Sequence, residues 1–417
     1  MCVEKKNKIL FVEPEIGGHQ IDHITYICDY YCHNNIKNNI FFLVNPKINY
    51  EIEYRGVKNK FDLYKKKGIK FVTINSYEFS QYNNKNLFIS SFYKLYITIK
   101  YAKILQVNWI HFLYIDHLQL SLAIRINNKN KYSISGTLFR LTSHYSKMFG
   151  IKENLRNRIK NIRKNILYGL MLRNRNVIKI FSLDPYFVEY GKNKFNKGDK
   201  LEKLTDPSLF KQFRNQFIND FKEIKFLKNR ITFLLFGHLS KRKGIFQILY
   251  SLKLLSDPYI KKSQFVFCGK IDKNIEISFL NKVENLKKNI NNLEIKIVNK
   301  IVSNKYLFSL IYKSDCILIP YQYFNGSSAA IFWASGAGKP VICQDYGLLG
   351  KWVKDYNLGL TVDSTKPIKI SNAIQYFIEN KNNIGNKESM KNFSKNHTPE
   401  RFAKTIFMPI IKGDKEA

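Results

Sequence analysis

The sequence lacks any run of about 20 consecutive apolar residues, so we expect no membrane-spanning helix. Its first residues, MCVEKKNKILFVEP, pass directly from charged residues into an expected strand, and we therefore expect no signal peptide. Cysteine is scarce: there are six, and Cys28 and Cys32 have no second pair at zinc-ligand spacing. We interpret the cysteines as core residues of a protein in a reducing compartment, and expect a cytoplasmic location.

Acidic residues are also few. The sequence has 32 Asp and Glu residues and 69 Lys and Arg residues, which gives a net charge of +37. Three explanations stay open: binding to an anionic membrane surface, binding to nucleic acid, and a composition rich in Lys, Asn and Ile throughout. A nucleic-acid binder should show a motif or a basic stripe with interleaved aromatic residues, so we expect no nucleic-acid partner.

The length of 417 residues suits two domains of about 200 residues each, and 45% apolar residues let both bury a core. Short apolar runs without alternation recur along the chain, which is typical of parallel strands buried on both faces. The runs are 8–13, 40–44, 69–74, 109–115, 132–137 and 177–182, then 231–236, 265–268, 293–298, 316–320, 340–343 and 359–362. The charged stretch 191–206 between the two sets predicts a linker.

The stretch from Ser314 to Gly350 carries the densest pattern. It reads as a strand, a loop of small and polar residues, a short helix and a second strand, which is one βαβ unit. The loop Asn325-Gly326-Ser327-Ser328 lies at the carboxyl end of the strand, where α/β sheets bind ligands. The helix that follows offers unpaired N–H groups to an anion or to sugar hydroxyls, and the alternative is an ordinary turn with a helix cap.

Two further loops follow expected strands. Arg242 and Lys243 precede a helix at 245–255, which predicts a site for an anion such as a diphosphate; a basic surface loop is the alternative. Gly17 and Gly18 follow the first strand and let a ligand approach the backbone, unless they only form a tight turn. No G-x-G-x-x-G is present, so a nicotinamide cofactor is not expected.

These motifs carry a resemblance. The strand and loop followed by Gly338-Lys339-Pro340-Val341-Ile342 resemble the donor-binding segment of retaining GT-B glycosyltransferases of the family-4 group, or glycosyl transferases group 1. Residues 237–244 are similar to the Gly-Arg-x-x-x-x-Lys-Gly of that family, with His238 in place of the arginine. Asn325 and Trp333 stand where the family usually has two glutamates, as in a divergent branch.

The resemblance covers nearly the whole chain and implies an α/β, GT-B architecture of two Rossmann-like domains facing across a cleft. We expect an acceptor-side domain at 1–200, a nucleotide-sugar donor domain at 201–395, and a C-terminal helix at 396–417 that returns to the domain junction. The implied activity moves a sugar, with retention, from a nucleotide-sugar to a glycan or lipid-linked acceptor, as in polysaccharide biosynthesis. The donor is a substrate, so no cofactor is expected. No metal is expected either, because Lys243 and Arg242 would stabilise the leaving phosphate.

The resemblance also implies the site residues. His117, after the strand at 109–115, would contact the sugar as the catalytic residue, with His111 on the same strand as the alternative. Arg140 and His144 are further candidates for the cleft lining. The implied donor-binding residues are Gly17, Gly18, His238, Arg242, Lys243, Asn325, Gly326, Ser327 and Ser328.

A basic amphipathic helix is expected at 153–171, where five apolar residues recur at steps of three and four among Arg and Lys. Either its apolar stripe packs on the sheet, or the helix docks on an anionic membrane and makes the protein peripheral at the inner face. Two alternatives to an enzyme also stay open: a catalytically silent GT-B scaffold and, from the charge alone, an RNA-binding protein.

Overall fold

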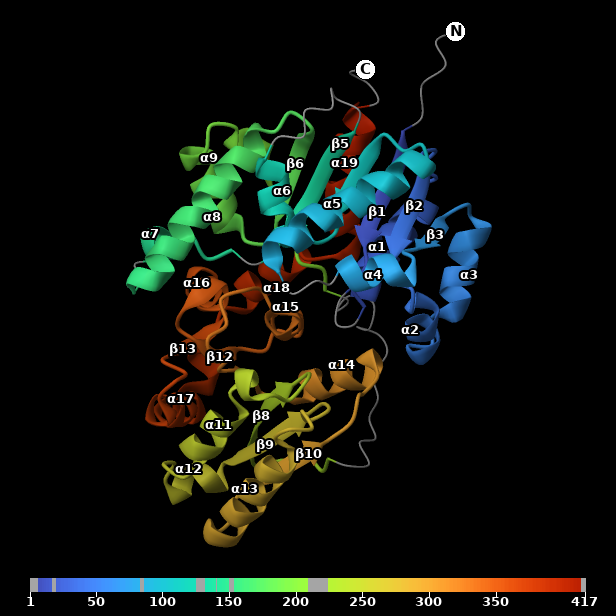
Figure 1. Cartoon of the computed structure of the whole chain (residues 1–417). Helices are drawn as coiled ribbons and strands as arrows, with labels where there is room; N and C mark the ends of the chain where they lie inside the picture. The colour runs from blue at the N-terminus through green and yellow to red at the C-terminus, as the bar shows by residue number, and fades with distance from the viewer. Residues whose placement is uncertain are drawn as a thin grey trace. The chain divides into compact units, whose positions relative to one another are not determined.

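The computed structural model describes residues 7–16, 20–82, 86–124, 132–139, 141–149, 154–208 and 224–413. The chain divides into two compact units (Figure 1): Met1–Thr205 with Pro399–Ala417, and Asp206–Thr398. Each unit is a parallel sheet with helices, as the apolar runs of the sequence predict. The glycine pair Gly17 and Gly18 and the candidate Arg140 lie outside the described residues.

The first unit contains a seven-stranded sheet of order β3-β2-β1-β4-β5-β6-β7, in which every neighbouring pair is parallel. This doubly wound order reverses next to β1, so the carboxyl ends of β1 and β4 lie at the place where such sheets bind ligands. The strands are β1 Lys8–Glu13, β2 Asn39–Val44, β3 Lys70–Thr73, β4 Trp109–Phe112, β5 Ser133–Leu138, β6 Val177–Ser182 and β7 Leu201–Lys203.

Helices cover this sheet, and the last of them comes from the far end of the chain. In α19, Phe407 lies 5.6 Å from Phe11 of β1 and 5.7 Å from Tyr30 of α1, measured between ring centroids. The red C-terminal helix therefore belongs to the blue and green unit (Figure 1). The helices are α1 Gln20–His33, α2 Ile48–Tyr54, α3 Lys58–Lys66, α4 Ser76–Tyr82, α5 Leu87–Ile104, η1 Asp116–Leu118, α6 Gln119–Ala123, α7 Tyr145–Phe149, α8 Leu155–Arg173, α9 Pro185–Lys194, η2 Gly198–Lys200 and α19 Pro399–Gly413.

The linker predicted at 191–206 is wrong over most of its length. Residues 191–203 complete α9, form η2 and add β7 to the sheet, where Leu201 pairs with Ile180. The two glycines of the stretch allow close packing: a Cβ on Gly191 would lie 2.2 Å from Leu201 Cδ1, and one on Gly198 would lie 2.5 Å from the Gly191 carbonyl oxygen. The apolar pattern of the sequence did not predict β7, because this strand is three residues long and only Leu201 in it is buried.

The second unit contains a six-stranded parallel sheet of order β10-β9-β8-β11-β12-β13, so the order in which strands are added reverses between β8 and β11. Its strands are β8 Ile231–Phe236, β9 Ser263–Cys268, β10 Ile295–Val298, β11 Cys316–Ile319, β12 Val341–Gln344 and β13 Gly359–Val362. Its helices are η3 Lys241–Lys243, α11 Ile245–Leu252, α12 Asp257–Lys261, α13 Glu276–Asn289, α14 Asn304–Lys313, α15 Ala329–Gly336, α16 Gly347–Asp355, α17 Pro367–Asn380, η4 Lys381–Asn383 and α18 Lys387–Lys395.

The cysteines of the described residues are free thiols. Cys28, Cys268, Cys316 and Cys343 are buried and Cys32 is half-buried, in agreement with the prediction that they pack in the core. Among the described residues, no group of three or more His, Cys, Asp or Glu side chains could hold a metal ion. None of the described helices is both long enough and apolar enough to cross a bilayer.

The basic helix α8 exposes the apolar stripe for which packing on the sheet was one of two interpretations. The stripe residues are between 41% (Leu170) and 72% (Leu155) exposed; between these two lie Ile159, Ile162 and Ile166. The opposite face is the buried one, and there the last turns of the helix supply Tyr168, Met171 and Leu172 to the core. Packing of the stripe on the sheet is therefore the wrong interpretation, and α8 presents apolar side chains to solvent.

A buried carboxyl group ends β1. Glu13 is 2% exposed, and its Oε1 accepts a hydrogen bond from the Glu15 N–H at 3.1 Å. Burial, with a smaller contribution from the Glu15 charge, raises the pKa of Glu13 to about 8. The folded protein therefore holds a proton on Glu13 that the unfolded chain releases near its ordinary pKa of 4.5.

We expect the stability of the protein to fall as pH rises from about 4.5 to about 8, because only the unfolded chain ionises Glu13 in that window. The loss is on the order of 5 kcal/mol. Glu13→Gln should abolish this slope and be more stable than the parent at pH 8, with similar stability at pH 4.5. Chemical unfolding at several pH values measures the difference, and parallel pH profiles for the two proteins would refute the assignment.

Candidate functional site

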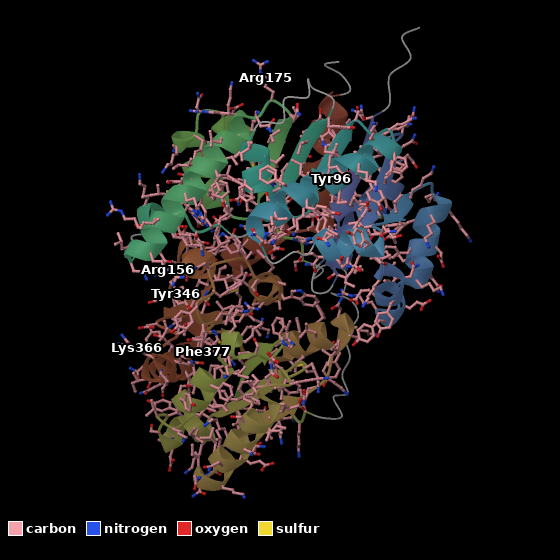
Figure 2. The ribbon with its side chains drawn as sticks, viewed as in Figure 1. Tyr96, Arg156, Arg175, Tyr346, Lys366 and Phe377 are labelled. Carbon is pink, nitrogen blue, oxygen red and sulfur yellow. The ribbon has the colours of Figure 1, made fainter. Side chains whose placement is uncertain are left out.

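The loop between β11 and α15 is held rigidly by side chains from the next loop of the sheet. The Tyr321 N–H donates to Gln344 Oε1 at 3.1 Å, and Gln344 Nε2 donates to the Phe324 carbonyl at 2.8 Å. The Tyr346 hydroxyl, labelled in Figure 2, donates to the Tyr321 carbonyl at 2.7 Å and accepts from the Tyr323 N–H at 2.7 Å. The loop therefore keeps its shape without a ligand, which limits the ordering cost of binding.

Three polar side chains from two loops meet beside this backbone. Lys243 is 9% exposed, and its Nζ donates to the Tyr321 hydroxyl and lies 4.2 Å from the centroid of the same ring. The Tyr321 hydroxyl lies 3.2 Å from Ser328 Oγ, within hydrogen-bond distance. We call Lys243, Tyr321 and Ser328 the ammonium cluster. It joins the two loops that the sequence singled out separately.

The ammonium cluster lies where α15 begins. Ser328 is the N-cap of this helix, and its Oγ accepts from the Ala330 N–H at 3.4 Å. The first N–H groups of α15 have no acceptor within the helix, and the helix dipole is positive at this end. A buried ammonium group beside a helix N-terminus favours a phosphate group or another anion.

Gly244 makes the approach of the two loops possible. Its φ of 75° lies in the left-handed region, and a Cβ on it would stand 2.1 Å from the Pro320 carbonyl oxygen. The Gln322 N–H donates to the Arg242 carbonyl at 2.7 Å beside this contact. The Lys-Gly pair of the motif thus has two separate tasks, since Lys243 supplies the charge and Gly244 lets the backbones touch.

Arg242 and His238 lie at the exposed side of the same loop. The Arg242 guanidinium lies 4.7 Å from the Phe324 ring centroid and 5.8 Å from that of Tyr321, so aromatic faces hold its charge next to the ammonium cluster. His238 is 64% exposed at its side chain, and its Nε2 lies 4.0 Å from Asp272 Oδ2. Arg242 is therefore well placed to support Lys243, whereas His238 is oriented toward an acidic residue.

The rest of the Asn325–Ser328 loop contacts the protein at each end. The Asn325 carbonyl accepts from the Leu348 N–H at 3.2 Å, and Ser327 Oγ donates to Asp206 Oδ2. Gly326 has room for a Cβ, whose nearest neighbour would be Phe324 Cζ at 3.4 Å. Trp333 is 6% exposed and packs in the core, so it cannot offer the hydrogen-bond acceptor that a glutamate would provide there.

The three candidate histidines of the first unit differ in how far they are exposed to solvent. His111 is fully buried, its Nδ1 lies 2.9 Å from Ser135 Oγ, and burial lowers its pKa to about 3. His144 is also fully buried, with Nε2 3.0 Å from Asp184 Oδ2. His117 in η1 is only half-buried and lines a cavity of about 810 Å³. Of the three, His117 alone is accessible to a ligand.

Several residues of the site were not among the predicted ones. Tyr321, Gln344, Tyr346 and Asp206 all contact the predicted loop or its serines. Tyr321 directly follows Pro320, the last residue of an expected strand, and this position could have identified it as a candidate site residue. Gln344 and Tyr346 also follow a strand, but Asp206 lies 121 residues from Ser327 in the sequence, and no spacing rule connects them.

Residues 216–398 match the family model of glycosyl transferases group 1. No curated protein matches the sequence. This stretch includes β8, the ammonium cluster and α15, so the family match covers the second unit and the candidate site in it.

Solved structures resemble the whole chain at low identity. A sucrose-phosphate synthase from Thermosynechococcus elongatus has a TM-score of 0.67 at 14% identity, with 99% of this chain and 100% of that chain covered. A glycosyltransferase from Rickettsia africae has a TM-score of 0.62 at 14% identity, with 99% of each chain covered. Anabaena Alr3699/HepE in complex with UDP has a TM-score of 0.60 at 13% identity, with 98% of this chain and 100% of that chain covered.

These likenesses confirm the predicted fold. The architecture is GT-B, with a Rossmann-like parallel sheet in each unit. At such low identity they show the fold alone, so the chemistry of the site has to be argued from its residues.

Proposed function

We propose that this protein is a glycosyltransferase that moves a sugar from a nucleotide-sugar donor to an acceptor in polysaccharide biosynthesis. The observation that carries the proposal is the ammonium cluster at the N-terminus of α15. The match of residues 216–398 to glycosyl transferases group 1 supports it, as do the UDP and UDP-glucose named in structures of Anabaena HepE.

In this transfer the bond between the anomeric carbon and the diphosphate breaks, and its electron pair goes to the diphosphate oxygen. A bond forms from the acceptor hydroxyl oxygen to the anomeric carbon, and the hydroxyl proton leaves with the diphosphate. The Lys243 ammonium, fixed by Tyr321, stabilises the charge that develops on the diphosphate, and Arg242 adds to it. With two cations in that role, we propose transfer without a metal ion. We propose retention at the anomeric carbon from the resemblance to glycosyl transferases group 1 alone.

One observation favours a second candidate, a catalytically silent scaffold that binds the nucleotide-sugar. In the resemblance, Asn325 and the buried Trp333 stand where the family usually has two glutamates, and neither side chain offers a carboxylate to the sugar. Asn325 keeps hydrogen-bonding groups for sugar hydroxyls, whereas Trp333 does not reach a ligand. In the silent scaffold the ammonium cluster binds the donor, but no transfer follows.

We also propose that the protein docks on an anionic membrane surface through α8. The stripe from Leu155 to Leu170 is exposed, and Arg156 and Arg158 flank it, so the helix combines apolar contact area with positive charge. Figure 2 labels Arg156 on this helix. The positive charge of these arginines complements acidic lipid headgroups, so we propose a lipid surface rather than a protein as the partner of α8.

Incubation with a panel of nucleotide-sugars separates the two candidates. We expect release of a nucleoside diphosphate from at least one donor, and faster release when membrane extract supplies the acceptor. Release should fall in Lys243→Ala. Binding without release or transfer would support the silent scaffold, and neither binding nor release would refute the proposed function.

Ser327→Val tests the loop itself. The change keeps roughly the side-chain shape and removes the hydroxyl that bonds Asp206, so the loop loses one charge-assisted hydrogen bond. We expect turnover to fall about tenfold, in line with about 1.5–3 kcal/mol for such a bond. Ser327→Thr keeps the hydroxyl and should restore turnover. Full activity of the valine variant, with an unchanged melting temperature, would mean that Ser327 is only part of a turn.

A further inference from the structure

The cavity that His117 lines has an uneven distribution of charge. It lies in the first unit, between the start of α5, the segment after β4 and one face of α8, and its volume is about 810 Å³. Helix α8 contributes Lys160, Arg163 and Lys164 to the lining. The one carboxylate in the lining is Asp116, whose Oδ2 already accepts a hydrogen bond from the Phe139 N–H at 2.9 Å.

Two cations on α8, Lys160 and Arg163, are available to a ligand. Within the described part of the chain, neither Lys160 nor Arg163 forms an ion pair, and both are exposed. Lys164 Nζ donates to Thr142 Oγ1 at 3.3 Å, which fixes its ammonium group at the edge of the cavity. Two exposed cations, with the engaged Lys164 and Asp116 beside them, make a site for an anion of high charge density, and phosphate is such an anion.

Most of the exposed surface of the cavity is apolar, although Asn86, Ser91 and Gln119 also line it. Phe88 is 58% exposed and packs on Phe92 with ring centroids 5.1 Å apart, and Leu120 and Leu167 lie on the facing walls. An exposed aromatic ring in a cavity costs free energy in water that an apolar ligand would recover. The cavity therefore suits a molecule with a phosphate group attached to a hydrocarbon chain.

We infer that this cavity binds the acceptor and that the acceptor is a lipid carrying a phosphate or diphosphate. The inference rests on the proposed function and names the chemical class of its acceptor. Lys160 and Arg163 bind the phosphate, while Phe88, Leu120 and Leu167 contact the first part of the hydrocarbon chain. The same helix turns its exposed apolar stripe outward, so a lipid could pass from the membrane surface along α8 into the cavity. His117 faces the bound headgroup as a hydrogen-bonding group.

Farnesyl diphosphate is a suitable probe because it is a soluble amphiphile with a diphosphate head. Titration calorimetry should use the full chain carrying Arg242→Ala and Lys243→Ala, so that the cations of the second unit do not bind the probe. We expect Lys160→Glu with Arg163→Glu to lower its affinity by tenfold or more. Arg173→Glu with Arg175→Glu is the matched control, since both are exposed, lie outside the cavity and change the charge equally; Figure 2 shows the Arg175 side chain projecting outward.

Equal affinity of the cavity variant and its control would overturn the inference, and so would equal affinity for inorganic pyrophosphate and farnesyl diphosphate. The first result would show that Lys160 and Arg163 do not bind the phosphate. The second would show that the hydrocarbon chain contributes nothing to binding. Melting temperatures show that the variants are folded. No nucleotide-sugar enters this experiment, so its failure alongside intact donor turnover rejects the acceptor assignment alone. Binding of the probe without any donor turnover rejects the proposed function and the role of the lipid as acceptor, and leaves a site for a lipid phosphate.

Discussion

Replacing Arg242 and Lys243 together with alanine is expected to weaken the binding of a nucleoside diphosphate by tenfold or more. Each charge-assisted contact to a phosphate contributes about 1.5–3 kcal/mol, and the variant removes two. Lys243 should account for the larger part, because it is buried and held by Tyr321, whereas Arg242 is exposed beside Phe324. Titration calorimetry with UDP and ADP measures the change.

Lys287→Ala with Lys288→Ala in α13 is the control for the loss of two positive charges. Both lysines are exposed and distant in sequence from the candidate site, so their removal should leave the affinity unchanged. An equal affinity for the parent and the Arg242–Lys243 variant would place the diphosphate elsewhere. An equal loss in both double variants would mean that the protein attracts anions only through its net charge of +37.

A second large effect is expected at the membrane. Arg156→Glu with Arg158→Glu should lower the partition coefficient onto vesicles that contain acidic phospholipid by at least 30-fold, as measured by co-sedimentation. Each basic residue near such a surface contributes about 1 kcal/mol, and reversal of the charge adds repulsion. These two arginines lie outside the cavity lining of His117, so the change leaves the proposed acceptor site intact.

Two further double variants separate the contribution of apolar contact from that of charge. Ile159→Ser with Ile162→Ser keeps every charge but removes apolar contact area, and it should also weaken binding, since both side chains are exposed. Lys287→Glu with Lys288→Glu makes the same charge change in the second unit and should have little effect. If the parent protein does not sediment with acidic vesicles at moderate salt, its basic composition explains the charge and the docking proposal is wrong.

The apolar runs of the sequence were enough to predict both sheets. Twelve strands were expected and all twelve occur, because strands buried on both faces need nearly continuous apolar residues. The strand expected to extend to 115 stops at Phe112, although Leu113 and Ile115 remain buried after the chain has turned. Among the described residues, β7 is the one strand that was missed, since an edge strand with one buried residue leaves no such pattern.

The candidate site could be predicted only in part. Arg242, Lys243 and Ser328 were predicted because strand ends and helix starts have local signals, and their role in binding stays a prediction. The meeting of Lys243 with Tyr321, and of Ser327 with Asp206, depends on which strands become neighbours, and that is a property of the folded sheet. The outward face of α8 was ambiguous for a similar reason: periodicity identifies an apolar stripe but not the element it faces.

A crystal structure of the protein with bound UDP tests the central claim most directly, namely that the ammonium cluster binds the diphosphate of the donor. We predict diphosphate oxygens within hydrogen-bond distance of Lys243 Nζ and of the first N–H groups of α15. The Tyr321 and Ser328 hydroxyls should stay in contact with each other or turn to the phosphate. A UDP molecule whose diphosphate lies away from Lys243 and from α15 would contradict the account.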